Sequence, residues 1–262
     1  MTEKTITDVM DPARACAMQA ALGIAPDISY GSALPPFFHQ LYFWEPETPE
    51  NLGRDGHPTP GGLIPDTGLS RRMWAGGRLT FLQPLVAGIK ADKTTTLEKV
   101  TQKDGAQGPL AFVRLRHDIR QRHATVLTEW QDLVYRGDAA RDDTPPDPVS
   151  ARTDEDHSEV FSFDTTLLFR YSALTFNGHR IHYDRPYARR IEGYHGLVVH
   201  GPLLAQVLML MAQDQLGKPL ATFDYRATAP LIGGEEATFC WKGGDAWVRG
   251  EDGRVCMTAK AG

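Results

Sequence analysis

The spacing of apolar and polar residues along the chain predicts a protein of mixed helices and strands. Residues 202–216 form an almost continuously apolar run that begins after Gly201 and ends at Gly217, and Pro202 can occupy a first helical position, so a buried helix is predicted here. Apolar stretches separated by glycine-rich turns follow it and predict strands over residues 221–231, 236–241, 246–250 and 255–260. A further strand is predicted over residues 159–169, where apolar and polar residues alternate.

The first part of the chain shows a similar alternation of elements. A helix is predicted over residues 11–22, and strands are predicted over residues 78–81, 94–101, 110–119 and 124–133. Residues 27–67 are rich in proline and glycine and contain the aromatic cluster Phe37, Phe38, Tyr42, Phe43 and Trp44. This segment is either a long packing loop or the lid or wall of a ligand pocket.

A polar segment divides the chain into two halves. Residues 137–158 are rich in Asp, Pro and small residues and have little to bury, so they predict a linker between residues 1–136 and residues 159–262. The two halves share a short internal similarity, because LQPLVAG at residues 82–88 resembles TAPLIGG at residues 228–234. Duplication of one structural unit explains this similarity economically.

Composition excludes several classes of protein. The formal net charge is -5, and no basic stripe is present, which disfavours binding to nucleic acid. Three cysteines at unrelated spacings fit neither a disulfide framework nor a paired-cysteine zinc site. The first residues lack the apolar core of a signal peptide, and no stretch approaches the roughly 18 apolar residues of a membrane span. We therefore expect a cytoplasmic protein without a membrane partner.

Candidate chemistry is concentrated in residues 169–201, which hold four of the nine histidines: His179, His182, His195 and His200. Asn177, His179 and His182 lie between a predicted strand and the apolar helix, and His200-Gly201 lies where that helix begins. We expect these two segments to meet in the folded protein.

The sequence YSALTFNGHRIHYD, at residues 171–184, resembles the Gly-Asp-x-Asn-Pro-x-His signature of the R-specific enoyl-CoA hydratases, which are also called hydratase 2 or MaoC-like proteins. In this comparison Phe176 takes the glycine place, Asn177 the catalytic aspartate place and His182 the catalytic histidine place. His179 takes the asparagine place and Arg180 the proline place.

The later His-Gly-Met of the family falls on residues 200–202. The stretches LTFN, HRIHYD, EGY and LVVHGPL, and residues 60–85, resemble more closely the hydroxyacyl-thioester dehydratase branch that includes mesaconyl-type (3-methylfumaryl-CoA) and itaconyl-CoA hydratases. The resemblance covers both halves of the chain.

This resemblance implies an α+β double hotdog fold, in which each half is a curled antiparallel sheet around a central helix. It also implies a hydratase or dehydratase of short 2-enoyl-CoA thioesters, with a branched C5-dicarboxylyl-CoA as the preferred substrate and a product such as citramalyl-CoA. No cofactor or metal is then required, because coenzyme A belongs to the acyl-CoA substrate. Since hotdog sheets extend by pairing, a homodimer is compatible with this fold.

The chemistry of hydration fits these residues. His182 can act as the base, because an imidazole titrates near neutrality, and the Gly201 N–H at a helix start can hold the thioester oxygen. Asn177 cannot exchange a proton as an aspartate does, so it is expected to orient water. Either His182 makes both proton transfers, or a second group such as His179 or Asp184 makes one.

Other residues of this segment have supporting or binding roles in the prediction. The expected substrate-binding residues are Arg180, Tyr183, Val199 and Arg190. The two arginines are included because a diacid or a phosphate needs cations. His200 is expected to hydrogen-bond a backbone carbonyl and so brace the turn at Gly201.

The same residues also include potential metal ligands. His179, His182 and Asp184 could ligate a divalent ion if their segment were helical, but Arg180 and the flanking residues argue against it, and no metal is predicted.

Three other functions fit the same fold. They are an (R)-3-hydroxyacyl-thioester dehydratase of fatty-acid metabolism, a hotdog acyl-CoA thioesterase and a non-catalytic acyl-CoA-binding protein. An acyl pocket lined by arginine would favour the diacid over the fatty chain, and release of free thiol would indicate the thioesterase.

Overall fold

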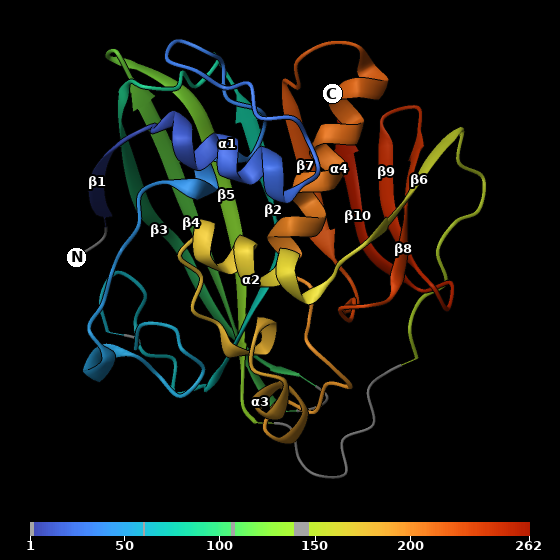
Figure 1. Ribbon diagram of the computed structural model, residues 1–262. Helices are drawn as coiled ribbons and strands as arrows, with labels where there is room; N and C mark the ends of the chain where they lie inside the picture. Colours follow the sequence, from blue (N-terminus) through green and yellow to red (C-terminus); the bar gives the residue numbers. More distant parts are fainter. Residues whose placement is uncertain (1–2, 60, 106–107, 139–146) are drawn as a thin grey trace.

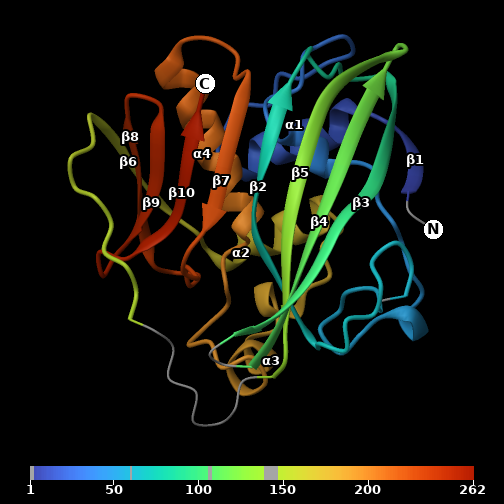
Figure 2. The same ribbon diagram turned by 180° about the vertical axis from the view of Figure 1, so that it is seen from behind.

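A computed structural model describes the whole chain except residues 1–2, 60, 106–107 and 139–146. The described strands form one antiparallel ten-stranded sheet in the order β1-β3-β4-β5-β2-β7-β10-β9-β8-β6. Figures 1 and 2 show that the helices lie together over one face of this curved sheet, while the other face is open. None of the described helices has the length and apolar character that crossing a bilayer requires.

The first half contributes one side of the sheet. Its strands are β1 (Glu3–Val9), β2 (Arg71–Phe81), β3 (Lys90–Gly105), β4 (Gly108–Gln121) and β5 (Ala124–Arg136). The predicted strands 94–101, 110–119 and 124–133 fall inside three of these, while β2 begins earlier than predicted. Strand β1 was not predicted, because EKTITDV lies at an exposed edge and buries almost no side chain; its partner is β3.

The second half contributes the other side of the sheet. Its strands are β6 (His157–Ser162), β7 (Thr222–Ala227), β8 (Glu236–Lys242), β9 (Asp245–Gly250) and β10 (Val255–Ala261). The prediction of one strand over residues 159–169 is wrong beyond Ser162. Asp164 accepts a hydrogen bond from the Leu167 N–H and begins helix α2 (Thr165–Leu174), so this cap ends the extended segment.

Strands β2 and β7 join the two halves into one sheet, with Gly77 opposite Tyr225. A Cβ atom on Gly77 would lie 2.2 Å from the carbonyl oxygen of Trp130 in β5 and 2.5 Å from the Tyr225 hydroxyl. Glycine is therefore required at this point, where the backbone of β5 and the Tyr225 side chain of β7 crowd the junction.

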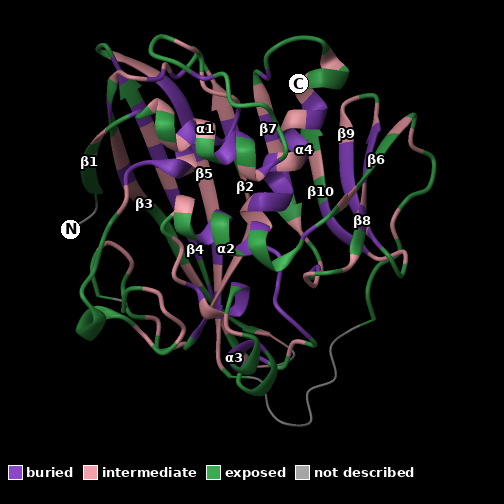
Figure 3. Ribbon diagram, viewed as in Figure 1, coloured by how far each residue is buried: buried purple, intermediate pink, exposed green. Residues whose placement is uncertain are grey.

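Helix α4 (Gly201–Leu216) is the central helix of the second half, and the predicted run 202–216 matches it. Leu203, Leu208 and Met209 are fully buried, and α4 contacts β7, β8, β9, β10 and β2. The buried stripe is visible in Figure 3. A helix wrapped in this way by a curled antiparallel sheet is a hotdog unit, and the chain has a double hotdog fold.

The internal similarity between the halves corresponds to equivalent backbone contacts. The Val199 N–H donates to the Leu231 carbonyl oxygen, and the Leu34 N–H donates to the Leu85 carbonyl oxygen, both at 2.8 Å. In the second half, the turn after β7 therefore lies beside the residues that lead into α4. In the first half, the turn after β2 lies beside the residues that lead into a shorter helical segment. Pro36 follows Leu34 by two residues, as Gly201 follows Val199, so Pro36 of the first half occupies the place of Gly201.

The helical segments that follow differ sharply between the halves. The second half continues into the 16 residues of α4, whereas the first continues only into the 3₁₀ helix η1 (Phe38–Leu41). Helix α1 (Pro12–Ala21) lies against α2 and η1 and agrees with the predicted helix 11–22. The first half thus has only a short helical turn where the second has its central helix.

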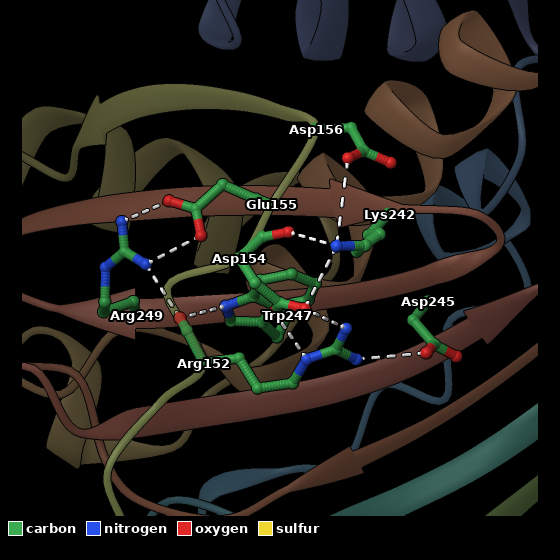
Figure 4. A network of polar contacts seen from close by, with 8 residues as sticks. All are labelled: Arg152, Asp154, Glu155, Asp156, Lys242, Asp245, Trp247 and Arg249. Atoms are coloured by element: carbon green, nitrogen blue, oxygen red, sulfur yellow. Dashed lines mark hydrogen bonds and ion pairs between the residues drawn. The ribbon is translucent and has the colours of Figure 1, made fainter.

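The end of the predicted linker that the structure describes is fastened to the second half. Figure 4 shows Arg152, Glu155 and neighbouring residues bound to side chains of β8 and β9, and the Trp247 indole N–H donates to the Arg152 carbonyl oxygen at 3.1 Å. The Arg249–Glu155 ion pair, at 2.6 Å, is the most buried pair of this network. The division at residues 137–158 itself stays a prediction, since residues 139–146 lie outside the described part.

Candidate active site

His182 lies beside the start of helix α4, in the 3₁₀ helix η3 (Arg180–His182). Its Nδ1 atom lies 2.7 Å from the Val198 carbonyl oxygen. Because a carbonyl oxygen can only accept, Nδ1 carries the hydrogen, and Nε2 of the neutral ring holds a free lone pair. Burial lowers the pKa of His182 to about 4, despite the opposing effect of this hydrogen bond, so the ring is neutral near pH 7.

His200 lies against His182, directly before α4. Its Nε2 atom is 2.8 Å from the Ser172 hydroxyl, and its Nδ1 atom is buried without a partner among the described residues. The expectation that His200 bonds a backbone carbonyl is therefore wrong, because the side chain turns toward α2 instead. Burial, and next the charge of His182, lower the pKa of His200 well below its ordinary value.

Asn177 is held in one orientation by its own loop. Its Oδ1 atom accepts a hydrogen bond from the His179 N–H at 3.0 Å, so the Nδ2 amide group is left as a donor. The preceding residue, Phe176, adopts a left-handed backbone with φ 51° and stacks on Trp44 at 5.0 Å. This residue takes the glycine place of the family signature, and the positive φ explains why glycine suits that place.

Gly201 is the first residue of α4, and within the described part of the chain its N–H has no acceptor, whereas the Leu203 and Leu204 N–H groups already donate to the His200 carbonyl oxygen. A Cβ atom at this position would lie 2.6 Å from Cε3 of Trp74, so glycine lets the helix start approach the indole. The N–H groups and dipole of the helix start favour a developing negative charge.

A cavity of about 470 Å³ brings these groups together. His182, Asn177, His179, Gly201 and Val199 all line it. The volume is within the range of small-molecule sites, about 300–1,000 Å³. The structure therefore places the imidazole of His182 and the start of α4 on one chamber, as the sequence-based hypothesis requires.

A larger cavity of about 1050 Å³ adjoins the first, and the two share lining residues such as Gln40, Asp55 and Arg72. It lies beneath the long segment 27–67 of the first half, where a full central helix is lacking. That segment is thus a pocket wall as well as a packing loop, since Phe37 and Phe38 are buried in the core.

Asp55 and His57 reach this site from the first half and were missed from the sequence. The Arg180 N–H donates to the Asp55 carbonyl oxygen at 2.8 Å, and a Cβ atom on Gly56 would lie 2.1 Å from the Gly178 carbonyl oxygen, so the loop docks tightly on the segment that leads to His182. His57 and His179 have ring centroids 4.7 Å apart. The only available signal was an Asp and a His within a long loop rich in glycine and proline.

The ligand atoms of Asp55, His57 and His179 all lie within 4.8 Å of one another, close enough for one divalent cation. Burial first, and then the charges of His182 and Arg72, lower the pKa of His179 to about 3, while burial raises the pKa of Asp55. Neutral imidazoles suit a metal, but the Arg72 guanidinium beside them repels one.

Several predicted residues do not reach the cavity. Arg180 donates to Asp184 at 2.7 Å, the Tyr183 hydroxyl donates to the Gly178 carbonyl oxygen at 2.7 Å, and Arg190 is exposed on helix α3 (Arg185–Arg190). Asp184 also accepts from the Tyr187 N–H and caps α3, and these bonds lower its pKa. It is therefore a structural anion and not a free proton carrier.

Two arginines of β2 line the cavity instead. Arg71 forms a buried ion pair with Glu192, with 2.6 Å between Nε and Oε2. Arg72 is half-buried and lines both cavities. In the sequence both arginines lie within the family resemblance of residues 60–85, but nothing else marked them as site residues, because consecutive arginines usually lie at the surface.

A second polar cluster lines the larger cavity. His39 Nε2 lies 2.9 Å from Oε2 of Glu129, and His117 Nδ1 lies 2.8 Å from the Thr95 hydroxyl. Burial alone would raise the pKa of Glu129, but the hydrogen bond and charge of His39 lower it, so the pair stabilises the carboxylate. Charged and polar side chains therefore line both cavities, alongside apolar ones.

Comparison with known proteins shows the family of this chain. The hydroxyacyl-thioester dehydratase type 2 family matches residues 37–233. A mesaconyl-C(4)-CoA hydratase of Chloroflexus aurantiacus is 45% identical over 204 residues, which cover 77% of this chain and 72% of that protein.

Two solved structures from Mycobacterium tuberculosis share the fold. HtdX superposes with a TM-score of 0.70 at 17% identity, covering 98% of this chain and 99% of that one. A conserved hypothetical protein described as having a double hotdog fold superposes with a TM-score of 0.61 at 14% identity, covering 100% and 95%. The chain belongs to the hydroxyacyl-thioester dehydratase type 2 family, whose named relatives are hydratases and dehydratases.

Proposed function

We propose that this protein adds water across the double bond of a short 2-enoyl-CoA thioester, and catalyses the reverse dehydration. One observation carries the proposal: the neutral imidazole of His182 and the Gly201 residue, whose N–H has no partner among the described residues, line the same chamber. These are the two groups that act at opposite ends of a conjugated thioester.

In the forward reaction, Nε2 of His182 removes a proton from water while the water oxygen bonds to the β-carbon. The electron pair of the double bond moves onto the thioester oxygen, which the Gly201 N–H and the start of α4 stabilise. The imidazolium then gives its proton to the α-carbon, so one water is added and His182 is neutral again. The burial that lowers the pKa of His182 favours this return of the proton.

Asn177 orients the attacking water. Its Oδ1 atom is occupied by the His179 N–H, so its Nδ2 group can donate to the water oxygen and leave a water hydrogen for His182. Asp184 is committed to Arg180 and to the α3 cap, which leaves His182 alone, or His182 with His179, for the two proton transfers. The edge-to-face contact of His179 and His182, with centroids 5.5 Å apart, keeps the second route open.

The preferred acyl group of this proposal is a branched C5-dicarboxylyl chain, of the mesaconyl or itaconyl type, giving a hydroxyacyl-CoA such as citramalyl-CoA. Two observations support it: the relative that is 45% identical is named a mesaconyl-C(4)-CoA hydratase, and arginine lines the chamber. The alternative, an (R)-3-hydroxyacyl-thioester dehydratase of fatty-acid metabolism, is supported by the family description.

The proposal includes no metal or organic cofactor, since the acyl-CoA substrate carries the coenzyme A. A cytoplasmic location and a homodimer are part of the same proposal. Size-exclusion chromatography with light scattering would show whether the chain is dimeric.

Mixing the protein with crotonyl-CoA, itaconyl-CoA and the mesaconyl-CoA isomers tests the reaction. Enoyl-thioester absorbance should fall without release of free thiol, and mass spectrometry should show the gain of one water. Thiol release matching the absorbance loss would instead identify a thioesterase, and binding without turnover would identify an acyl-CoA-binding protein.

A further inference from the structure

We propose that Arg72 binds the free carboxylate of the acyl group and thereby selects dicarboxylyl thioesters over neutral ones. This inference rests on the proposed hydratase function and names the residue that determines its substrate. The Arg72 guanidinium lines the chamber and has no hydrogen-bond or ion-pair partner among the described residues.

Arg72 lies near the start of β2, opposite Tyr135 of β5. Its neighbour Arg71 is neutralised by Glu192 through a 2.6 Å ion pair and a 3.0 Å hydrogen bond to the Glu192 carbonyl oxygen. Within the described part of the chain, by contrast, no group forms a hydrogen bond or ion pair with the Arg72 guanidinium.

A half-buried guanidinium has five N–H donors and a permanent charge, and withdrawing these from water is unfavourable unless an anion meets them. A planar carboxylate matches this group, because two parallel N–H···O bonds can form. Asp55 attracts the charge at longer range but forms no ion pair with it among the described residues. The ligand is therefore expected to supply the anion that pairs with Arg72.

The position of Arg72 suits an anion on the acyl group. Arg72 and His182 line the same chamber of about 470 Å³. The positive charge of Arg72 contributes to the lowered pKa of His57 and of His179, which shows that its field reaches the wall beside the catalytic imidazole. In a C5 dicarboxylyl chain the free carboxylate is one or two bonds from the alkene, whereas the phosphates of coenzyme A are separated from it by the whole pantetheine arm.

Gln131 adds a neutral amide to the lining of both cavities, which Arg72 also lines. A purely apolar wall would have favoured a fatty chain.

The test compares two substrates in the full-length protein. Mesaconyl-C4-CoA carries the carboxylate, and crotonyl-CoA has a hydrogen in its place and lacks the branch. Arg72→Gln should lower kcat/KM for mesaconyl-C4-CoA by about a hundredfold or more, and leave kcat/KM for crotonyl-CoA within about threefold. Arg72→Lys, which keeps the charge but not the fork, should lose an intermediate amount.

Arg78→Gln is the matched control, because Arg78 is exposed on the same strand and pairs only loosely with Asp224, at 3.6 Å. It should leave both rates unchanged. An equal loss on both substrates would overturn the proposal. Arg72 would then either bind the coenzyme A phosphates or stabilise the fold, and thermal unfolding of the variant would distinguish these two roles. Unchanged rates on both would overturn it too.

The outcome for the wild-type protein separates this inference from the proposed reaction. Hydration of crotonyl-CoA without preference for mesaconyl-C4-CoA would leave the hydratase intact and reject the role of Arg72. Hydration of neither would reject the proposed function itself.

Discussion

The imidazoles of His182 and His200 lie face to face, with centroids 3.6 Å apart and ring planes 19° apart. Two positive charges at this separation repel strongly in a buried site, so only one ring can carry a proton at a time. The Nε2 atom of His200 is engaged with the Ser172 hydroxyl, so the proposed mechanism assigns proton exchange with the chamber to His182.

Replacing His182 by Gln should therefore lower kcat for enoyl-CoA hydration by about a hundredfold or more, since a positioned acid–base group contributes roughly 10²–10⁴-fold. The glutamine amide can still donate to Val198, so the fold should persist. His157→Gln is the control, because His157 lies on edge strand β6 and pairs only with Glu159. A loss of tenfold or less in His182→Gln would remove it from the proton-transfer role.

Asn177 separates water orientation from proton transfer. Asn177→Ala should lose about tenfold to a hundredfold in kcat, because the donor to the water is removed. Asn177→Asp keeps the acceptor for the His179 N–H and places a titratable oxygen where Nδ2 stood, so it should retain activity within about tenfold and add an ionisation to the pH–rate profile. A profile identical to that of the wild type would show that this side chain takes no part in proton chemistry.

Gly201→Ala should abolish measurable hydration, because its methyl group would meet Trp74 at 2.6 Å and displace the start of α4. The double variant Gly201→Ala with Trp74→Phe relieves that contact and should recover at least about tenfold of the lost kcat/KM. Recovery of the thermal unfolding temperature without recovery of the rate would argue that the Gly201 N–H does not donate to the thioester oxygen.

Stability should fall as the pH is lowered below the unfolded pKa of histidine. Burial lowers the pKa of His117 from 6.5 to about 4 in the folded protein, so the unfolded chain binds the proton first. The contribution of His117 to the free energy of unfolding is full above pH 6.5 and declines toward pH 4, by up to about 1.4 kcal/mol per pH unit. Denaturant unfolding of His117→Gln should therefore show a shallower loss between these pH values than the wild type; an equal slope would contradict it.

Removal of metal ions tests whether Asp55, His57 and His179 hold a catalytic cation. Dialysis against EDTA should leave the hydration rate unchanged within about twofold, since the chemistry assigned to His182 and Gly201 uses no Lewis acid. Restoration by Zn²⁺ of activity lost on dialysis would instead show that the trio holds a catalytic ion. His57→Ala would then abolish that restoration.

The helix and strands around α4 were predictable because their apolar residues are buried in a regular pattern. The helical start of α2 was not, since VFSFDTTLLF alternates like a strand and only the Asp164 cap decides the change. The residues Asn177, His182 and Gly201 are local in sequence and carry a family signature, so they could be named in advance. Asp55, His57 and Arg72 could not, because tertiary docking of a distant loop and strand brings them to the chamber.

Pro36 of the first half stands where Gly201 stands in the second, and an imide nitrogen has no hydrogen to give to an oxyanion. The two copies of the fold are thus not equivalent as catalysts. Titration with a tight-binding thioester analogue should saturate at one equivalent per polypeptide, and a dimer would hold two such sites rather than four.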